Sequence, residues 1–171
     1  MESNERRKIV LDTIAKSEKP LSASALAKMV HVSRQIIVGD VALLRAAGHK
    51  IIATPRGYVC EAWKEQGIIK TIAVEHSEEE MMDEIYTIVD LGGTLLDVIV
   101  EHPVYGQLSA QLHIASRYDA QQFEKKVAQN SAKPLSKLTD GLHLHTIQCQ
   151  NEDVYQRILA ALDEKGYLYK R

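Results

Sequence analysis

The chain has 171 residues, 45% of them hydrophobic, a length that suits one large domain or two small ones. It has no apolar run of the ~18 residues that a membrane-spanning helix needs, and its charged start, MESNERRKIV, lacks the apolar core of a signal peptide. The two cysteines, Cys60 and Cys149, fall in different segments and indicate no disulfide framework. We therefore expect a reduced, cytoplasmic protein without membrane contact.

The net charge of −2 conceals an asymmetry along the chain. Residues 1–60 hold ten Lys/Arg against five Asp/Glu, whereas residues 61–171 hold eleven against eighteen. A basic first third indicates an anionic partner, and the acidic remainder indicates a different task.

The first sixty residues predict three helices followed by a β-hairpin. Apolar residues recur at helical spacing in three segments: Ile9, Val10 and Ile14; Leu26, Met29 and Val30; Ile37, Val41 and Leu44. Ser22 or Ser24 can cap the second helix, and Ser33 can cap the third. Two short strands, 50–53 and 58–60, flank a TPRG turn. This order is that of a winged helix-turn-helix domain, which we assign to residues 1–61.

The third helix is the expected recognition helix for double-stranded operator DNA. Ser33, Arg34 and Gln35 stand at its start, where polar side chains meet phosphates and base edges. We expect Arg56, at the tip of the hairpin, to reach a neighbouring phosphate or the minor groove. Winged helices also serve as protein–protein modules, but the basic balance favours DNA.

The segment PLSASALAKMVHVSRQIIVGDVALLRAAGHKIIATPRGYVC resembles the helix-turn-helix of the biotin-repressor type. The match covers about the first third of the chain. This resemblance implies a bacterial transcription regulator.

After a polar connector at residues 61–67, strands and helices alternate. The segment IIKTIAVEHS, residues 68–77, predicts a strand that runs into a turn, and Ser77 and Glu80 would open the next helix as a capping box. One or two strands, interrupted at His102, lead to a second helix, and a strand from His143 to Cys149 leads to the last. This pattern predicts an α+β sandwich over residues 70–171, with helices covering a sheet mostly on one face.

The stretch DGLHLHTIQC places two histidines on one side of a strand. Residues i and i+2 share a face, so His143 and His145 could hold one ion between them. Two such histidines are more often ordinary half-buried residues, so further ligands are needed. His76, Glu80 and Glu84 are the candidates. Spacing alone does not choose between the two glutamates, although capping competes for Glu80.

The motifs AVEHSEEEMMDEI, DVIVEHPVYGQL, SRYDAQQF and PLSKLTDGLHLHTI together resemble the three-histidine, or 3H, domain of the NiaR family of nicotinate-responsive repressors. The match covers nearly all of residues 70–171. The resemblance implies one divalent metal per chain, held by His76, Glu84, His143 and His145. It also implies nicotinate as co-repressor, control of genes for NAD synthesis or nicotinate uptake, and a homodimer, the state that DNA reading by one short helix also favours.

Three imidazoles and a carboxylate suit nickel, zinc, iron or manganese, with nickel or zinc first, and do not suit magnesium or calcium. The ring nitrogen of nicotinate could fill an open position on the metal while Arg117 clamps its carboxylate. His102 and Tyr105 are candidates for the pocket wall. Each of the three has a structural alternative: a surface salt bridge, a turn residue and a core residue, respectively.

Two other functions compete with a nicotinate-dependent repressor. A pure metal sensor would respond to the ion without an organic ligand. A metalloenzyme would use the open metal position to activate water. We do not expect an enzyme, because the sequence offers no spare, obviously placed general base beyond the metal ligands.

Overall fold

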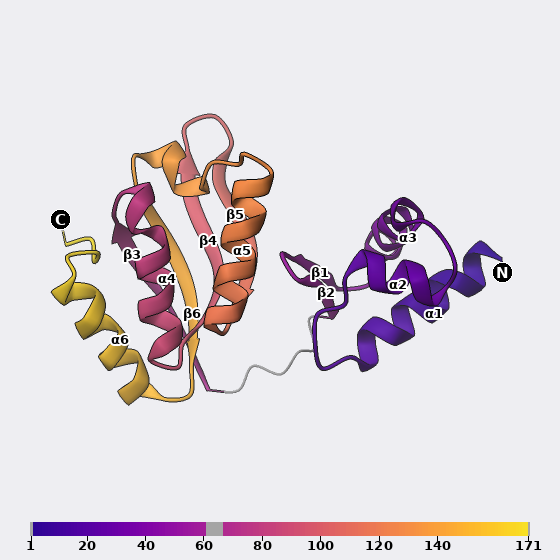
Figure 1. Ribbon diagram of the computed structural model, residues 1–171, viewed down its shortest axis with the longest axis horizontal. Helices are drawn as coiled ribbons and strands as arrows, with labels where there is room; N and C mark the ends of the chain where they lie inside the picture. The colour runs from indigo at the N-terminus through magenta and orange to yellow at the C-terminus, as the bar shows by residue number, and fades with distance from the viewer. Residues whose placement is uncertain (1, 61–66, 171) are drawn as a thin grey trace. The chain divides into compact units, whose positions relative to one another are not determined.

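The computed structural model describes residues 2–60 and 67–170, which form two compact units, one on each side of the gap (Figure 1). Residues 61–66 of the expected connector lie outside the described residues. None of the helices in the described ranges is long and apolar enough to cross a membrane.

The first unit consists of three helices and a hairpin. Its elements are α1 (Ser3–Lys16), α2 (Ala23–Met29), α3 (Arg34–Ala46), β1 (Ile51–Thr54) and β2 (Gly57–Cys60). The hydroxyls of Ser22 and Ser33 accept the backbone N–H groups of Ala25 and Ile36, so both act as helix N-caps. The buried side chains of the three helices form one core.

One residue expected in that core is exposed. Met29 is 45% exposed, whereas Leu26, Ala27 and Val30 are buried. The inward stripe of α2 starts at Ala23, which sets the i, i+3, i+4, i+7 series one position away from Met29.

The hairpin is tied to the helices through Leu21. Its backbone N–H and carbonyl bond those of Tyr58 at 3.0 and 2.8 Å, adding a bridge beside β2. Gly57 makes this possible: its φ is +140°, and any side chain there would collide with the backbone of Leu21. The β1–β2 hairpin is therefore held against the segment that precedes α2.

The second unit is a four-stranded antiparallel sheet with helices packed on it (Figure 1). Its strands are β3 (Ile68–Glu75), β4 (Thr94–His102), β5 (Gly106–Ile114) and β6 (Leu142–Cys149), in the order β3-β6-β4-β5. Its helices are α4 (Met81–Asp90), α5 (Arg117–Gln129) and α6 (Glu152–Glu164), with 3₁₀ turns η1 (Glu78–Glu80) and η2 (Leu135–Thr139).

Burial alternates along the central strand β6, where every second side chain from His143 to Cys149 is buried. These side chains, with Ile72 and Val74 of β3, belong to the face that α4, α5 and α6 cover. An antiparallel sheet with one helix-covered face has this period-two pattern. The two histidines therefore face the helices, among the core side chains.

Candidate metal centre

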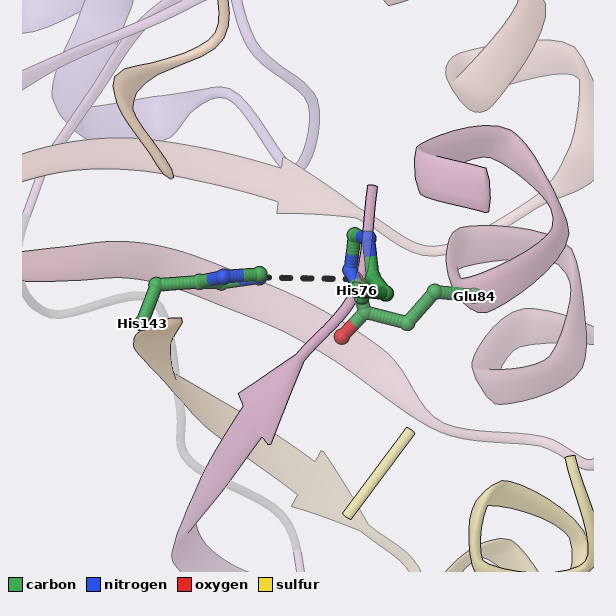
Figure 2. A group of neighbouring side chains, drawn as sticks. All are labelled: His76, Glu84 and His143. Carbon is green, nitrogen blue, oxygen red and sulfur yellow. Dashed lines mark hydrogen bonds and ion pairs between the residues drawn. The ribbon is translucent and has the colours of Figure 1, made fainter. Parts of the chain in front are cut away.

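The second unit gathers three histidines and a glutamate at one end of the sheet. The antiparallel register of β3 and β6 pairs Val74 with His143, and His76 follows two residues after Val74. Glu84 lies in the first turn of α4 and points toward the histidines (Figure 2). His145 lies one pleat further along β6. All four side chains are buried, and Glu84 is 0% exposed.

The ligand atoms of the four residues converge on Glu84. Nε2 of His76 lies 2.5 Å from its Oε2, Nε2 of His143 lies 3.5 Å from the same oxygen, and Nε2 of His145 lies 3.3 Å from Oε1. The donor atoms of His76, Glu84 and His143 all lie within 4.8 Å of one another. His145 adjoins this group through a 3.1 Å separation between its Nε2 and that of His143.

Backbone carbonyls determine which ring nitrogen of each histidine carries the proton. Nδ1 lies 2.7 Å from the carbonyl oxygen of Ser77 in His76, 2.8 Å from that of Gly141 in His143, and 2.6 Å from that of Asp97 in His145. A carbonyl oxygen only accepts hydrogen bonds, so each Nδ1 carries a proton and donates. In a neutral ring each Nε2 then has a free lone pair. Three such nitrogens close to one carboxylate form a donor set for a cation, which would take the place of the protons between them.

The carbonyl of Asp97 is available because the ladder is irregular there. The pairing of β4 with β6 shifts register between Leu95 and Ile99. Within this shift the Asp97 carboxylate accepts the backbone N–H of Thr146 at 2.8 Å, and the carbonyl accepts Nδ1–H of His145. The irregularity thus orients one of the four candidate ligands.

Electrostatics keep the buried carboxylate charged. Burial by itself raises the pKa of Glu84, but the charge of His145 and hydrogen bonds to the three histidines outweigh it and hold this pKa well below its usual value. Burial lowers the pKa values of His76 and His145, and their bonds and attraction to Glu84 outweigh that effect and raise them. Among the described residues, Oε1 of Glu84 has no hydrogen bond of good geometry, and Nε2 of His145 is the nitrogen near it, at 3.3 Å. A carboxylate in this setting fits a bound cation.

Tyr167 supports His76 from the C-terminal end of the unit. The two rings meet edge to face with their centroids 5.4 Å apart. The hydroxyl of Tyr167 donates to Asp83 at 2.8 Å, and Lys165 donates to the same carboxylate at 2.9 Å. Burial and the bond to Asp83 raise the pKa of Tyr167 to about 12, so the hydroxyl remains a donor at neutral pH.

A small cavity of about 40 Å³ adjoins the cluster, and Glu84, His143 and His145 form part of its wall. The rest of the wall is mostly apolar and comes from the sheet, α4, α5, η2 and Pro134. The apolar part is Met81, Ile85, Leu95, Val98, Leu112, Phe123, Pro134 and Leu135, and Ser136 adds one hydroxyl. An open coordination position on a metal held by the cluster could face this space.

The three residues expected to bind the carboxylate or form the ligand pocket lie outside this cavity wall. Arg117 makes a two-point salt bridge with Asp90 at 2.7 and 2.6 Å, and its guanidinium stacks on Tyr86. Nδ1 of His102 accepts the backbone N–H groups of Val104 and Tyr105 in the β4–β5 turn. Tyr105 is 74% exposed. For Arg117 and His102 these contacts are the salt bridge and the turn role that the sequence also allowed.

Comparison with known protein families gives the same division of the chain. Residues 69–171 match the 3H domain, and residues 6–59 match a helix-turn-helix (HTH) domain. The chain is 40% identical to the probable transcription repressor NiaR of Thermotoga maritima, over 96% of this chain and 93% of the relative. It is 41% identical to the transcription repressor NadR of Bacillus subtilis, over 99% and 96%.

The chain belongs to the NiaR and NadR family of 3H-domain transcription repressors. The relatives are transcription repressors, so membership indicates a transcription regulator. The expected fold class is confirmed, a helix-turn-helix unit followed by an α+β unit.

In this 3H repressor the residues expected to contact DNA are placed on the first unit. Ser33, Arg34 and Gln35 are exposed at the start of α3, and Arg56 is half-buried in the hairpin turn. The Ser33 hydroxyl is engaged as N-cap, which leaves Arg34 and Gln35 as the freer side chains of the three.

Several residues that shape the site carried no sequence signal. Gly141, Asp97 and Tyr167 orient the histidines, and Ser136 and Phe123 line the cavity. The only local hint was the Asp-Gly pair at 140–141, which is typical of a tight turn. The others depend on pairing between segments distant in the sequence.

Proposed function

We propose that this 3H repressor binds operator DNA as a homodimer in the cytoplasm, and that a divalent metal and nicotinate in its second unit set its operator affinity. The regulated genes are those of NAD synthesis or nicotinate uptake. The observation that supports a metal site is the 3.1 Å distance between the Nε2 atoms of His143 and His145. Both rings have Nδ1 tied to carbonyls, so in their neutral forms the two Nε2 lone pairs face each other beside the buried Glu84.

A bound cation would accept both of these lone pairs. Moving protons among neutral rings would not remove the contact between them, because each Nδ1 keeps its proton to donate to a carbonyl. His76, His143 and His145 supply three nitrogens and Glu84 supplies a carboxylate oxygen, a set that suits nickel or zinc first and iron or manganese next. The bound ion would supply a positive charge and an open position at the end of the sheet. The protein's part is orientation, through the three Nδ1–H bonds to carbonyls.

Nicotinate then acts as co-repressor through differential affinity. If the effector binds the DNA-competent form of the dimer more tightly, DNA and effector each raise the other's affinity by the same factor. A dimer suits this role because one recognition helix reads one half-site, and two helices in fixed spacing read the operator.

Operator binding, measured by fluorescence anisotropy at fixed ionic strength, tests the proposal with four samples: metal-loaded and chelator-treated protein, each with and without nicotinate. We expect tight binding only with metal and nicotinate together. An operator affinity that depends on the metal and not on nicotinate would support the alternative, a pure metal sensor. An operator affinity that depends on neither the metal nor nicotinate would exclude the second unit as the sensor.

Metal content after dialysis tests the site itself. His145→Ala should lose stoichiometric metal. His102→Ala, which removes a histidine outside the cluster on the neighbouring strand, should keep it. Equal metal content in both variants would contradict the assignment of His145 as a ligand.

A further inference from the structure

The recognition helix contains a glycine that the packing of the free protein does not require. Gly39 lies in the middle of α3, is exposed and has ordinary helical backbone. A Cβ built on it would meet no atom of the described residues within 4 Å, apart from its chain neighbours and the helix's own backbone. At Gly57 and Gly141, in contrast, a Cβ would collide with the backbone of another segment. Glycine within a helix is less stable than alanine, so the free protein loses stability at Gly39 without gaining a contact.

Gly39 lies on the outward side of α3, between two exposed apolar side chains. Ile36 and Leu43 are 42% and 56% exposed, and they stand three residues before and four residues after Gly39, so the three are neighbours on the helix surface. The buried side chains of α3 are Ile37, Asp40, Val41 and Leu44. At 3.6 residues per turn, Gly39 lies roughly opposite these four. Ile36, Gly39 and Leu43 thus form an apolar strip that faces solvent in the free protein.

The apolar strip has no negative charge beside it that would repel DNA. The one acid of α3 is Asp40, which is 3% exposed. Its carboxylate accepts Nε–H and Nη2–H of Arg6 at 2.6 and 3.2 Å. The charge of Asp40 is therefore compensated inside the unit, and the outward side of α3 can approach an anionic partner.

The dimensions of the major groove make a small outward residue useful. The groove is about 12 Å wide, and an α-helix with its side chains is about 10–12 Å across. A helix that lacks a side chain on its outward side can therefore bring its backbone closer to the base pairs. The apolar group that a base edge presents in this groove is the C5-methyl of thymine. An apolar side chain next to the glycine is suited to contact that methyl group.

We propose that Gly39 is the point at which α3 approaches the base pairs most closely, and that Ile36 contacts the methyl group of a thymine in each operator half-site. This contact rests on the operator binding proposed above and adds the base feature that is recognised. Arg34 and Gln35 supply hydrogen bonds, which read the polar atoms of the base edges. Ile36 discriminates by the methyl group, which hydrogen-bond donors and acceptors do not detect.

Two substitutions at Gly39 test the close approach. The protein is the metal-loaded full chain with nicotinate, and the DNA is a duplex that the wild type selects from a random-sequence pool. Gly39→Ala should raise the unfolding temperature of the first unit by roughly 4–8 °C. The same variant should weaken operator binding, measured by fluorescence anisotropy, by at least about tenfold, in the range of one lost base contact. Gly39→Leu should weaken binding further, because its side chain is larger.

The opposite signs separate contact with DNA from a structural role, since a substitution that damaged the fold would lower both the unfolding temperature and the operator affinity. Ala46→Leu is the matched control. It adds the same side chain to an exposed position in the last turn of the same helix, two turns beyond Gly39. We expect its operator affinity to remain within about twofold of the wild type, because a recognition helix contacts base edges through its N-terminal part.

Replacing thymine by uracil tests the methyl contact, because uracil differs from thymine only in lacking the C5-methyl group. The thymines of one half-site are replaced one at a time. At the thymine that Ile36 contacts, uracil should weaken binding of the wild type by about fourfold, the contribution of one buried methyl group. Ile36→Ala should bind the thymine and uracil duplexes equally at this position, because the side chain that met the methyl group is absent.

Three results would contradict the proposal. Wild-type operator affinity in Gly39→Ala would refute the close approach. Equal losses of affinity in Gly39→Leu and Ala46→Leu would show that bulk anywhere on the outward side has the same effect. A response to uracil that is the same in the wild type and in Ile36→Ala at every thymine would refute the methyl contact. If the wild type selects no duplex from the pool, the proposed operator binding itself is wrong.

Discussion

Gly141 and His76 approach so closely that no side chain fits between them. Gly141 has a φ of +96°, and a Cβ built on it would overlap the carbonyl oxygen of His76. The carbonyl of the same glycine accepts Nδ1–H of His143 at 2.8 Å and the backbone N–H of His76 at 3.4 Å. One peptide unit thus sets the distance between two candidate ligands from different strands.

Gly141→Ala should therefore separate the two histidines and weaken metal binding by about 10–100-fold, the usual range for residues that orient ligands. Gly92→Ala is the matched control, since its φ of +93° carries the same backbone strain while the nearest atom to its Cβ is Val154 Cγ1 at 3.8 Å. Competition with a fluorescent chelator measures both affinities. If both variants lose affinity equally, general destabilisation is responsible and the close approach is not.

Glu84→Gln should reduce metal affinity by more than about 100-fold, because it removes the charge while keeping the shape of a buried ligand. Glu80→Gln should leave the affinity within about twofold, since the Glu80 carboxylate is occupied by the N–H and hydroxyl of Ser77. Metal content by mass spectrometry after equilibrium dialysis reports both. Equal loss in the two variants would show that the assignment of Glu84 is wrong.

Arg34→Ala should weaken operator binding by ~1–3 kcal/mol and lower its salt dependence, because Arg34 is exposed at the start of the recognition helix. Arg45→Ala removes the same charge from the last turn of the same helix and should have a smaller effect. Anisotropy titrations at several salt concentrations give both numbers, with thermal unfolding to verify the fold. If Arg34→Ala binds the operator as tightly as the wild type does, this face of α3 does not contact the DNA.

Tyr167→Phe and Tyr167→Ala should separate the two contacts of this residue. The phenylalanine variant loses the bond to Asp83 and should lower the free energy of unfolding by ~0.5–1.5 kcal/mol, with metal affinity nearly unchanged. The alanine variant also removes the ring from His76 and should weaken metal binding. Equal metal affinity in the two variants would mean that the ring does not orient His76.

Chelation should destabilise the second unit alone. Within residues 2–60 and 67–170, the group that could hold a metal lies in this unit, whose core is separate from that of the first. Free metal at about 100 times its dissociation constant adds ~2.7 kcal/mol to the stability of the form that binds it. Differential scanning calorimetry with and without chelator should move one transition and leave the helix-turn-helix transition in place; movement of both would contradict this.

The sequence by itself determined most of the helices and strands and, with the exception of Met29, which side chains of the first three helices face inward. Helical spacing located α3 and its buried side chains Ile37, Val41 and Leu44, and period-two alternation put His143 and His145 on one face of β6. These are local properties, because the geometry of a helix or strand alone decides which side chains share a face. The resemblance to the 3H domain, and not spacing, chose Glu84 over Glu80.

Tertiary structure decided which faces meet. Register between β3 and β6 put His76 beside His143, and the η1 turn before α4 turned Glu84 inward while its capping bond kept Glu80 at Ser77. Packing of α5 against α4 brought Arg117 to Asp90. The cavity wall is therefore mostly apolar where the sequence suggested a cation. Residues distant in the chain meet only when strands pair and helices pack, so no local pattern in the sequence records these contacts.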